Sequence, residues 1–203
     1  MNLDNIEKLY TNNISKYGID SRAVGWNSQE SQNMRFKKLL EVVEDKSVSS
    51  SINELGCGYG ELFKYLENNE FEFEQFNGYD ISQPMLDSCK KYLNSPQKVY
   101  LYHHSSLKTK ADYSLTSGIF NTPFQNDREI WEKYIENTLK NMYEYSNKGI
   151  SFNFLTTYVD FKSDNLFYKN PSDILDFCLK NFGKKVVIYH DYNLFEYTVI
   201  VKK

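Results

Sequence analysis

The chain has 203 residues, which is enough for one domain with a sizeable core, and its formal net charge is −3. No strongly basic segment is present, so the composition disfavours a nucleic-acid partner, because such partners select a positive surface. The three cysteines have neither metal nor disulfide spacing and no run of about 18 apolar residues occurs, so we expect a reducing, cytoplasmic setting without export, membrane span or metal.

The first 48 residues are predicted as a helical N-terminal arm that belongs to the same domain as residues 49–203. A serine-rich turn over 47–51 leads from this arm into a first strand at about 51–56. Helical spacing is clearest in the last part of the arm, where apolar residues recur on one face: Met34, Phe36, Leu39, Leu40 and Val43.

A glycine-rich loop follows the first strand, with G-x-G-x-G spacing from Gly56 to Gly60, ahead of a helix predicted over 60–69. Asp80 ends the second predicted strand, 75–80. Glycines let a backbone approach a ligand closely, and an acid at the tip of the second strand can accept hydrogen bonds from ribose hydroxyls. The loop therefore predicts a nucleoside site; the alternative is a turn that only joins a strand to a helix.

Two acids beside the loop separate two classes of cofactor. Dinucleotide sites use G-x-G-x-x-G, and Glu61 stands where the third glycine of that pattern would be. Carboxylates at Glu54 and Glu61 would repel a pyrophosphate, whereas they suit a ligand that carries a sulfonium and an ammonium group.

Downstream of Asp80, predicted strands and helices alternate. Ser82 is the expected N-cap of a helix through Leu93, with Pro84 in its first turn. Five β-α steps and a closing hairpin, with its turn at Tyr192 and Asn193, predict an α/β fold with a doubly wound, mostly parallel sheet. The remaining predicted elements are strands at Lys98–His103, Ala111–Ser117, Gly149–Thr156, Lys184–Asp191 and Leu194–Val201, and helices over 127–147 and Ser172–Asn181.

The pattern Glu54-x-Gly56-x-Gly58-x-Gly60 resembles the first motif of class I S-adenosylmethionine-dependent methyltransferases. The resemblance implies a Rossmann-like seven-stranded sheet in the order 3-2-1-4-5-7-6 with an antiparallel last pair, and S-adenosyl-L-methionine as cofactor. It also implies that the glycines shape the loop around the methionine part, that Glu54 reaches the ammonium group through water, and that Asp80 holds the ribose. Most of the chain resembles a group of small bacterial methyltransferases of mostly unassigned substrate.

Ligands of such sheets bind outside the carboxyl ends of the parallel strands, which selects the loops that follow each strand. The loops after the first three strands are expected to border the cofactor, and the later loops to surround the methyl acceptor. The resulting cofactor set is Trp26, Arg35, Glu54, Gly56, Cys57, Gly58, Gly60, Asp80, Ile81, Met85, Ser106, Leu107, Ser117 and Gly118.

The sequence departs from the family pattern in two of these loops. Many relatives carry an acid after the third strand that binds the adenine amino group, whereas here Ser106 and Leu107 are the expected adenine neighbours. Enzymes that methylate the amino groups of nucleic-acid bases carry D-P-P-Y-like motifs after the fourth strand. The segment Ser117–Asn121 has no such motif, which argues against that substrate.

The arm has two open interpretations. Trp26 would cover the site and Arg35 would pair with the methionine carboxylate of the cofactor, because arms of this superfamily often act as lids. Alternatively, Trp26 packs in a core and Arg35 is a charge on the surface of a helix.

Methyl transfer mainly requires alignment of the reacting atoms, and a base only for a poorly ionised acceptor. His190 paired with Asp191 is the expected base, unless His190 merely caps the hairpin turn. Asn121 can orient a substrate hydroxyl but cannot accept its proton. The expected substrate contacts are Phe120, Asn121, Tyr158 and Asp160.

The sequence therefore predicts a methyltransferase for a small polar metabolite, acting at oxygen on a sugar, a phosphorylated compound or a carboxylate. Tailoring of a surface polysaccharide is one such role. The alternatives are N-methylation of a small amine and a cofactor-binding protein without activity. We expect a monomer or homodimer.

Overall fold

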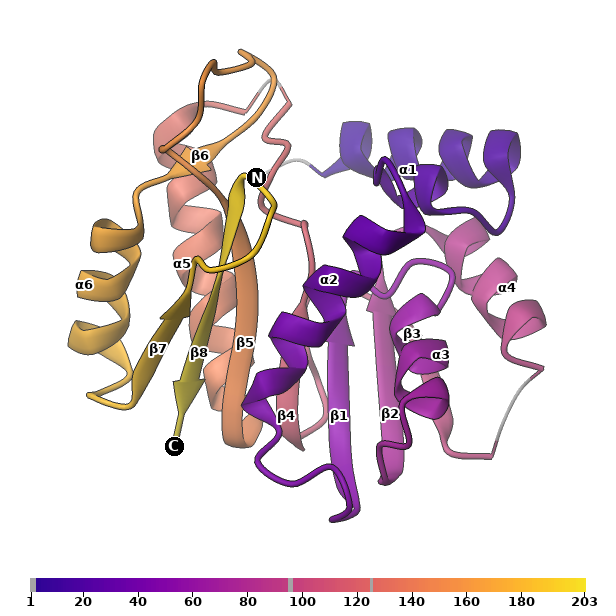
Figure 1. Cartoon of the computed structure of the whole chain (residues 1–203). Coiled ribbons are helices and arrows are strands. Elements are labelled where there is room, and N and C mark those ends of the chain that lie inside the picture. The colour runs from indigo at the N-terminus through magenta and orange to yellow at the C-terminus, as the bar shows by residue number, and fades with distance from the viewer. Residues whose placement is uncertain (1–2, 95–96, 125) are drawn as a thin grey trace.

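Short buried strands and amphipathic helices alternate along the chain and form a twisted sheet with helices on both faces (Figure 1). The computed structural model describes residues 3–94, 97–124 and 126–203. Its strands are β1 (Ser50–Leu55), β2 (Phe73–Asp80), β3 (Val99–His103), β4 (Ala111–Thr116), β5 (Ser146–Thr156), β6 (Tyr168–Lys169), β7 (Val186–Tyr189) and β8 (Glu196–Lys202).

The strand order is β3-β2-β1-β4-β5-β8-β7, with the short strand β6 beside β5. Strands β1 to β5 run parallel, and β8 is antiparallel to both β5 and β7. Once β6 is set aside, this is the predicted Rossmann-like order 3-2-1-4-5-7-6, which is confirmed. The sequence prediction missed β6, because two residues leave no periodicity to detect.

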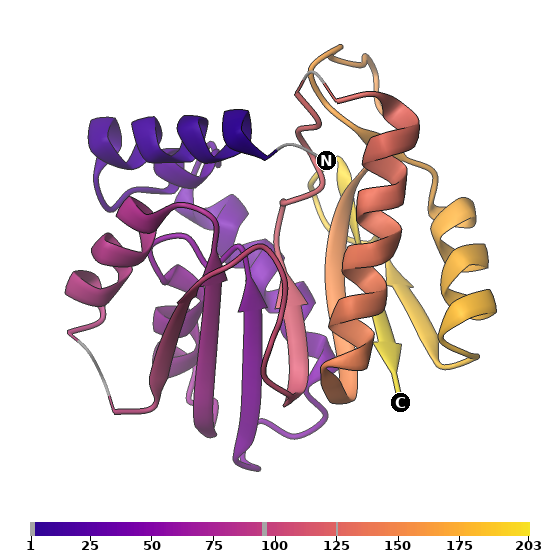
Figure 2. The ribbon, with the colours of Figure 1, turned by 180° about the vertical axis from the view of Figure 1, so that it is seen from behind.

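Two layers of helices cover the sheet (Figure 2). Apolar side chains of α2, α3 and α4 pack on one face, and those of α5 and α6 pack on the other. The helices are α1 (Asp4–Tyr17), α2 (Gln29–Leu39), α3 (Glu61–Asn68), α4 (Gln83–Tyr92), α5 (Arg128–Glu144) and α6 (Pro171–Asn181), with short 3-10 helices at Ser21–Val24 and Leu40–Val42. Among the described helices, none has the length and apolar character that crossing a bilayer requires.

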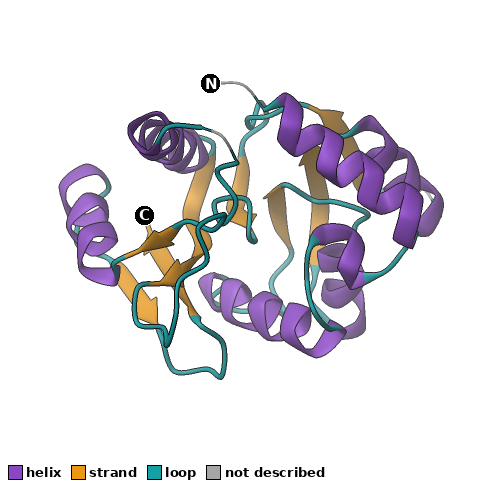
Figure 3. Ribbon diagram, turned by 90° about the horizontal axis from the view of Figure 1, so that it is seen from above, coloured by secondary structure: helices purple, strands orange, loops and turns teal. Residues whose placement is uncertain are grey.

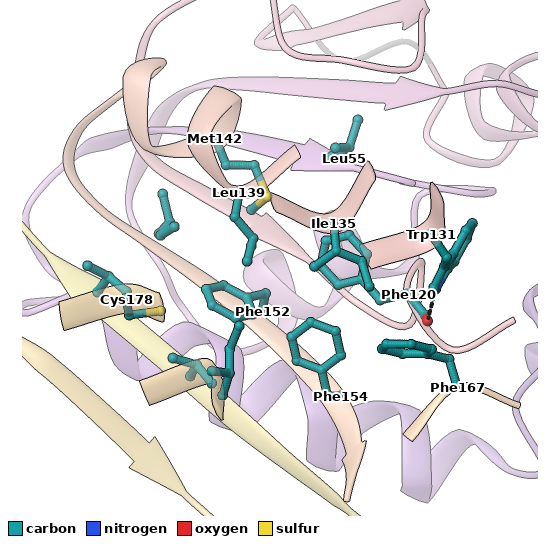
Figure 4. Packing of buried hydrophobic residues seen from close by; sticks show 14 of the residues in the cluster. Leu55, Phe120, Trp131, Ile135, Leu139, Met142, Phe152, Phe154, Phe167 and Cys178 are labelled. Atoms are coloured by element: carbon teal, nitrogen blue, oxygen red, sulfur yellow. Dashed lines mark hydrogen bonds between the residues drawn. The ribbon is translucent and has the colours of Figure 1, made fainter. Parts of the chain in front are cut away.

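Aromatic side chains fill the core between the sheet and α5 (Figure 4). Phe120 stacks on Phe154 with ring centroids 5.1 Å apart, and Trp131 donates a hydrogen bond from Nε1 to the Phe120 carbonyl at 3.1 Å. Each such fully buried side chain contributes about 1.5–3 kcal/mol to folding. Phe120, expected to contact the substrate, is completely buried in this core and does not line the cavity described below.

Two predicted boundaries differ from the structure. Helix α5 ends at Glu144 rather than near Asn147, because the Ser146 side chain bonds to Met142 and Ser114 and draws the chain into β5. The last two strands are joined by residues 190–195 rather than by a two-residue turn. The Tyr192 side chain turns inward there, and its hydroxyl lies 2.9 Å from Thr198 Oγ1, which prevents a tight hairpin.

A row of amides crosses the inside of the sheet. Gln75 donates to Asn77, Asn77 donates to Asn53, and Asn53 donates to the Thr109 carbonyl, at 2.8, 2.9 and 2.8 Å. Asn53 and Asn77 are fully buried, so each bond satisfies an amide that water cannot reach.

Helix α1 lies across the end of the sheet at which the parallel strands finish (Figure 1). Its Ile6, Tyr10 and Ile14 pack inward, and Thr11 Oγ1 lies 2.8 Å from Oγ of Ser82, the N-cap of α4. Figure 3 shows the same end from above, with loops lying between the helices. The stretch predicted as a helical arm thus holds α1, positioned over the strand ends, and α2, which packs on one face of the sheet.

Candidate functional site

A cavity of about 390 Å³ opens at the carboxyl ends of β1, β2, β4 and β5, beneath α1 and α2. This is the position at which doubly wound sheets bind their ligands. The cavity is lined by the glycine loop and by side chains from the helices, strand ends and loops around it, among them Tyr10, Trp26, Gln32, Arg35, Glu54, Asp80, Ile81, Met85, His104, Ser117, Asn121, Tyr134 and Glu196.

The glycine loop forms one wall of the cavity. The amides of Gly56 and Cys57 both donate to the Tyr79 carbonyl, at 2.7 and 2.9 Å, which ties the loop to β2. Gly58 has a φ of +54°, and a Cβ there would come within 2.7 Å of Val24, so only glycine fits between the loop and the arm. The loop therefore presents bare backbone to the cavity.

Asp80 is held at the tip of β2 by two backbone amides. Its Oδ2 accepts from Gly58 at 2.9 Å, and its Oδ1 accepts from Ser82 at 2.8 Å. Burial raises the pKa of this carboxyl, although the backbone hydrogen bonds act in the opposite direction. Each carboxylate oxygen keeps a further lone pair, which suits the hydroxyl pair of a ribose.

Glu54 is a buried acid that lacks a partner for one oxygen. Its side chain is 3% exposed, and Oε2 makes no hydrogen bond within the protein. Burial, followed by the nearby Cys89, Asp80 and Glu61, raises its pKa well above the ordinary value. A cationic ligand group beside Glu54 would compensate this unpaired oxygen, so the donor set fits a nucleoside with a cationic tail.

Arg35 does not face the cavity as a free cation. It is 7% exposed and pairs with both oxygens of Glu196, with Nε 2.9 Å from Oε2. Its guanidinium carbon lies 3.8 Å from the centre of the Trp26 ring. Neither expectation for Arg35 describes this arrangement, because sequence alone could not bring β8 to α2.

The ion pair continues into the sheet. Asn153 donates to Glu196 Oε2 at 2.6 Å and accepts the Gly118 amide at 2.8 Å. Gly118 has a φ of +75°, and a Cβ there would come within 2.6 Å of the Trp26 ring. Trp26 is thus held between Arg35 and the turn after β4, where it lines the cavity.

Gly60 does not line the cavity, and neither do Ser106 and Leu107, whereas the other members of the expected cofactor set do. Leu107 is fully buried in the core, because its amide and carbonyl both bond to the Asn141 side chain, at 2.9 and 3.3 Å. Their neighbours His104 and Ser105 line the cavity instead. The Cys57 thiol stays protonated, since the adjacent Cys89 thiol and burial raise its pKa.

The expected base and two expected substrate contacts lie outside the cavity wall. His190, Asp191, Tyr158 and Asp160 are exposed, and Asp191 forms an ion pair with Lys38 at 2.8 Å. His190 contacts the rings of Tyr158 and Tyr197. The reason is topological: β7 is separated from β5 by β8, so the end of β7 lies beyond the acceptor region.

Sequence reasoning missed Tyr10, Tyr134 and Glu196 as cavity residues. Burial, followed by the charge of Asp80, raises the pKa of Tyr10 to about 12, so it is a neutral hydroxyl. Glu196 left a signal, since it is an acid within an apolar aromatic strand, between Phe195 and Tyr197. Buried acids in strands usually have a partner.

Among the described residues, no group of three or more His, Cys, Asp and Glu side chains lies close enough together to hold a metal ion.

Sequence comparison finds one informative relative. No protein-family model matches the chain. The chain is similar to Rv1506c of Mycobacterium tuberculosis, a protein named as a methyltransferase, with 36% identity over 155 residues. The match covers 75% of this chain and 93% of that protein.

Solved structures share the fold at low sequence identity. Magnesium protoporphyrin IX methyltransferase from Synechocystis PCC 6803, with bound S-adenosylmethionine, has a TM-score of 0.63 and 14% identity, covering 97% of this chain and 95% of that one. A DhpI complex with S-adenosylmethionine has a TM-score of 0.68 and 11% identity, covering 98% and 96%. Phosphoethanolamine N-methyltransferase 1 of Haemonchus contortus has a TM-score of 0.69 and 9% identity, covering all of this chain and 50% of that one.

Proposed function

Because this chain belongs to the class I S-adenosylmethionine-dependent methyltransferases and uses S-adenosylmethionine as its methyl donor, we propose that it methylates a small polar metabolite at oxygen. Held by the glycine loop, Glu54 and Asp80, the cofactor would supply an electrophilic methyl group on sulfur. An acceptor hydroxyl would take this methyl group as the carbon–sulfur bond breaks with its electron pair left on sulfur, and would release its proton to water. The product is S-adenosyl-L-homocysteine.

The cofactor half of the cavity fits this donor. Glu54, with its unpaired Oε2, would face the ammonium end, and Asp80 would accept the ribose hydroxyls. The loop from Gly56 to Gly60 would surround the methionine part. A backbone carbonyl of the segment with His104 and Ser105, or the Ser105 hydroxyl, would accept the hydrogen bond of the adenine amino group. It would replace the acid that many relatives use for this contact.

The size and cover of the cavity carry the proposal of a small acceptor. Its volume of about 390 Å³ lies at the low end of the range for small-molecule sites, about 300–1,000 Å³. Helix α1 lies over it and α2 contributes Gln32, Arg35 and Phe36 to its wall, which supports a small acceptor over a macromolecule. The hydroxyl of Ser117 and the amide of Asn121 suit an acceptor with a hydroxyl group.

The proposal also covers the class of partner, the cellular compartment and the oligomeric state. The net charge of −3 supports a small-molecule substrate over a nucleic acid. All three cysteines are buried free thiols, which supports a reducing, cytoplasmic compartment. We propose a monomer or homodimer.

Calorimetry and labelled methyl transfer test the proposal. S-adenosylhomocysteine should bind and NAD should not; preferential NAD binding would contradict the cofactor assignment. Incubation of the enzyme with methyl-labelled S-adenosylmethionine and a panel of alcohols, sugars, amines and carboxylates should then label a hydroxyl compound. Label found only on amines would replace O-methylation by N-methylation, and a protein that binds the cofactor but labels nothing from cell extract would be a binding protein.

A further inference from the structure

We propose that the acceptor of this enzyme is an uncharged molecule with an apolar body, held by neutral hydrogen bonds, rather than a phosphate or a carboxylate. This inference rests on the proposed function and narrows its substrate class. It follows from the charges that line the acceptor side of the cavity, next to the ends of β4, β5 and β8.

Acidic side chains outnumber basic ones among the described residues of the cavity wall. Glu54, Glu61, Asp80 and Glu196 all line it, whereas Arg35 is the one Lys or Arg among its described lining residues. His104, the one histidine among the described lining residues, accepts the Ser106 amide at Nδ1, at 3.1 Å. An anionic acceptor would therefore find no unpaired Lys or Arg among the described residues that line this cavity.

The positive charge of Arg35 is already neutralised. Its Nε and Nη2 bond to Glu196, its Nη1 donates to the Ser31 carbonyl at 2.8 Å, and its flat face rests on Trp26. An anionic acceptor would have to displace Glu196, and Glu196 would stay behind as a buried carboxylate without its cation. Breaking a buried pair in this way costs about two orders of magnitude in affinity.

Two unsatisfied neutral groups face the same region. Asn121 Oδ1 and Ser117 Oγ are buried without a hydrogen-bond partner, and both residues line the cavity. The Asn121 amide oxygen accepts only N–H or O–H donors, so it favours a hydroxyl over a carboxylate or phosphate oxygen, and the Ser117 hydroxyl can donate to or accept from that hydroxyl. These two atoms therefore supply the polar recognition that Arg35 does not.

The rest of the acceptor side is apolar. Leu3, Ile6, Ile119, Tyr134, Leu155 and Leu166 line the cavity there. Burial and the loss of solvation raise the pKa of Tyr134, so its hydroxyl stays neutral. An acceptor that carries a hydroxyl on a largely apolar body matches this wall.

Two probes that share a ring and differ in charge test the inference. Benzyl alcohol and benzoate are titrated at neutral pH into the wild-type protein saturated with S-adenosylhomocysteine, and binding is followed by saturation-transfer NMR. We expect the alcohol to bind at least about tenfold more tightly than the anion. A protein that binds benzoate equally well or better, or that binds neither probe at millimolar concentration, overturns the inference.

Two variants locate the effect. Glu196→Gln leaves the charge of Arg35 uncompensated, so benzoate affinity should rise about tenfold while that of the alcohol stays within about twofold. Asn121→Leu removes the neutral acceptor and should weaken the alcohol about fivefold, whereas Asn193→Leu, an exposed control of the same chemistry, should not. If Glu196→Gln does not fold, two measurements still test the inference: the ratio of alcohol to benzoate affinity in the wild type, and the comparison of Asn121→Leu with Asn193→Leu.

The outcome separates this inference from the proposed function. Failure of S-adenosylhomocysteine to bind contradicts the methyltransferase assignment itself. Normal S-adenosylhomocysteine binding with a preference for benzoate contradicts only the uncharged acceptor. An unchanged benzoate affinity in folded Glu196→Gln would contradict the role of the ion pair in this selection.

Discussion

Burial of an ionised Glu54 would destabilise the folded protein, whereas the same ionised side chain would help to bind a cationic ligand. Burial raises its pKa above 4.5, so the folded protein prefers the protonated acid. The raised pKa of Glu54 stabilises the folded state fully below pH 4.5. This stabilisation is lost as the pH rises through the raised pKa of the folded state. The ionised acid is nevertheless the form that a cationic ligand would select.

The substitution Glu54→Gln should therefore have opposite effects on stability and on affinity. Without ligand, urea denaturation at a series of pH values from 4.5 upward should show that the variant loses the decline of the wild type and becomes the more stable protein. Calorimetry should show about tenfold weaker S-adenosylhomocysteine binding, because a charge-assisted interaction is lost. A variant with unchanged affinity would contradict the proposed role of Glu54.

Gly118 is the residue that allows Trp26 to reach its position. Gly118→Ala should displace the indole ring and weaken S-adenosylhomocysteine binding about tenfold, because the added Cβ would come within 2.6 Å of that ring. Gly183→Ala is the matched control, since Gly183 also has positive φ but nothing within 4 Å of an added Cβ. Both variants should lose about 1 kcal/mol from backbone strain, and only the first should lose binding. Equal binding by the two would show that Trp26 does not shape the site.

The residues that sequence placed best are those fixed by local backbone. Glycine spacing and the acids at two strand ends locate Glu54, Gly58 and Asp80 beside one cavity, as expected for a doubly wound sheet. Arg35 and His190 depend on partners from distant strands. Pairing of Arg35 with Glu196 spans 161 residues, and no local pattern announces it.

Helix α1 is the element expected to move. It packs on α4 and on the 3-10 helix at Ser21–Val24, and it is joined to the N-cap of α4 through Thr11. These contacts are fewer than those of the central strands, so local opening of α1 requires less free energy than unfolding of the sheet.

Hydrogen–deuterium exchange should reveal α1 as a lid. Its amides should exchange faster than those of β1 and β4, and S-adenosylhomocysteine should slow them, because Tyr10 lines the cavity. Thr11→Val should speed α1 exchange about fivefold through loss of the hydrogen bond to α4, whereas Ser15→Ala, which removes only a hydrogen bond within α1, should not. An exchange rate in α1 that S-adenosylhomocysteine leaves unchanged would argue against a lid.

The amide row inside the sheet gives a test of the strand framework. Asn53→Leu should lower the free energy of unfolding by about 3 kcal/mol, because Asn77 and the Thr109 carbonyl lose a buried partner. The double variant Asn53→Leu/Asn77→Leu should be less destabilised than the sum of the single variants, since it removes both ends of one bond. Denaturation in urea measures all three, and strict additivity would contradict the coupling.

Elements with strong periodicity were predictable from the sequence. Short elements, and element ends that are fixed by hydrogen bonds to other strands, were not. Helix α4 begins at the expected cap, Ser82, because the cap, proline and apolar spacing all agree. The end of α5 and the last connection depend on Ser146 and Tyr192, whose partners lie on other strands. Tertiary hydrogen bonds decided these boundaries against local propensity.

At the scale of the whole molecule, the strand order came from the family resemblance and the strands themselves from periodicity. Alternation of strands and helices predicts parallel β-α steps, but it does not say on which side of β1 the sheet continues. The structure adds that one cavity joins both halves of the sheet: β1 and β2, where we propose that the cofactor binds, and β4, β5 and β8, where we propose that the acceptor binds. The charge of the acceptor wall emerges only when both halves are in place.

The position of β8 between β5 and β7 has a consequence for synthesis on the ribosome. The nascent chain can pair β1 to β5 as they emerge, but β7 has no neighbour in the sheet until β8 arrives. Glu196, the anion that neutralises Arg35, lies on β8, the last strand to be synthesised. A nascent or prematurely terminated chain would therefore carry a bare guanidinium over an unfinished pocket, and translation itself sets the moment at which the enzyme acquires its selectivity.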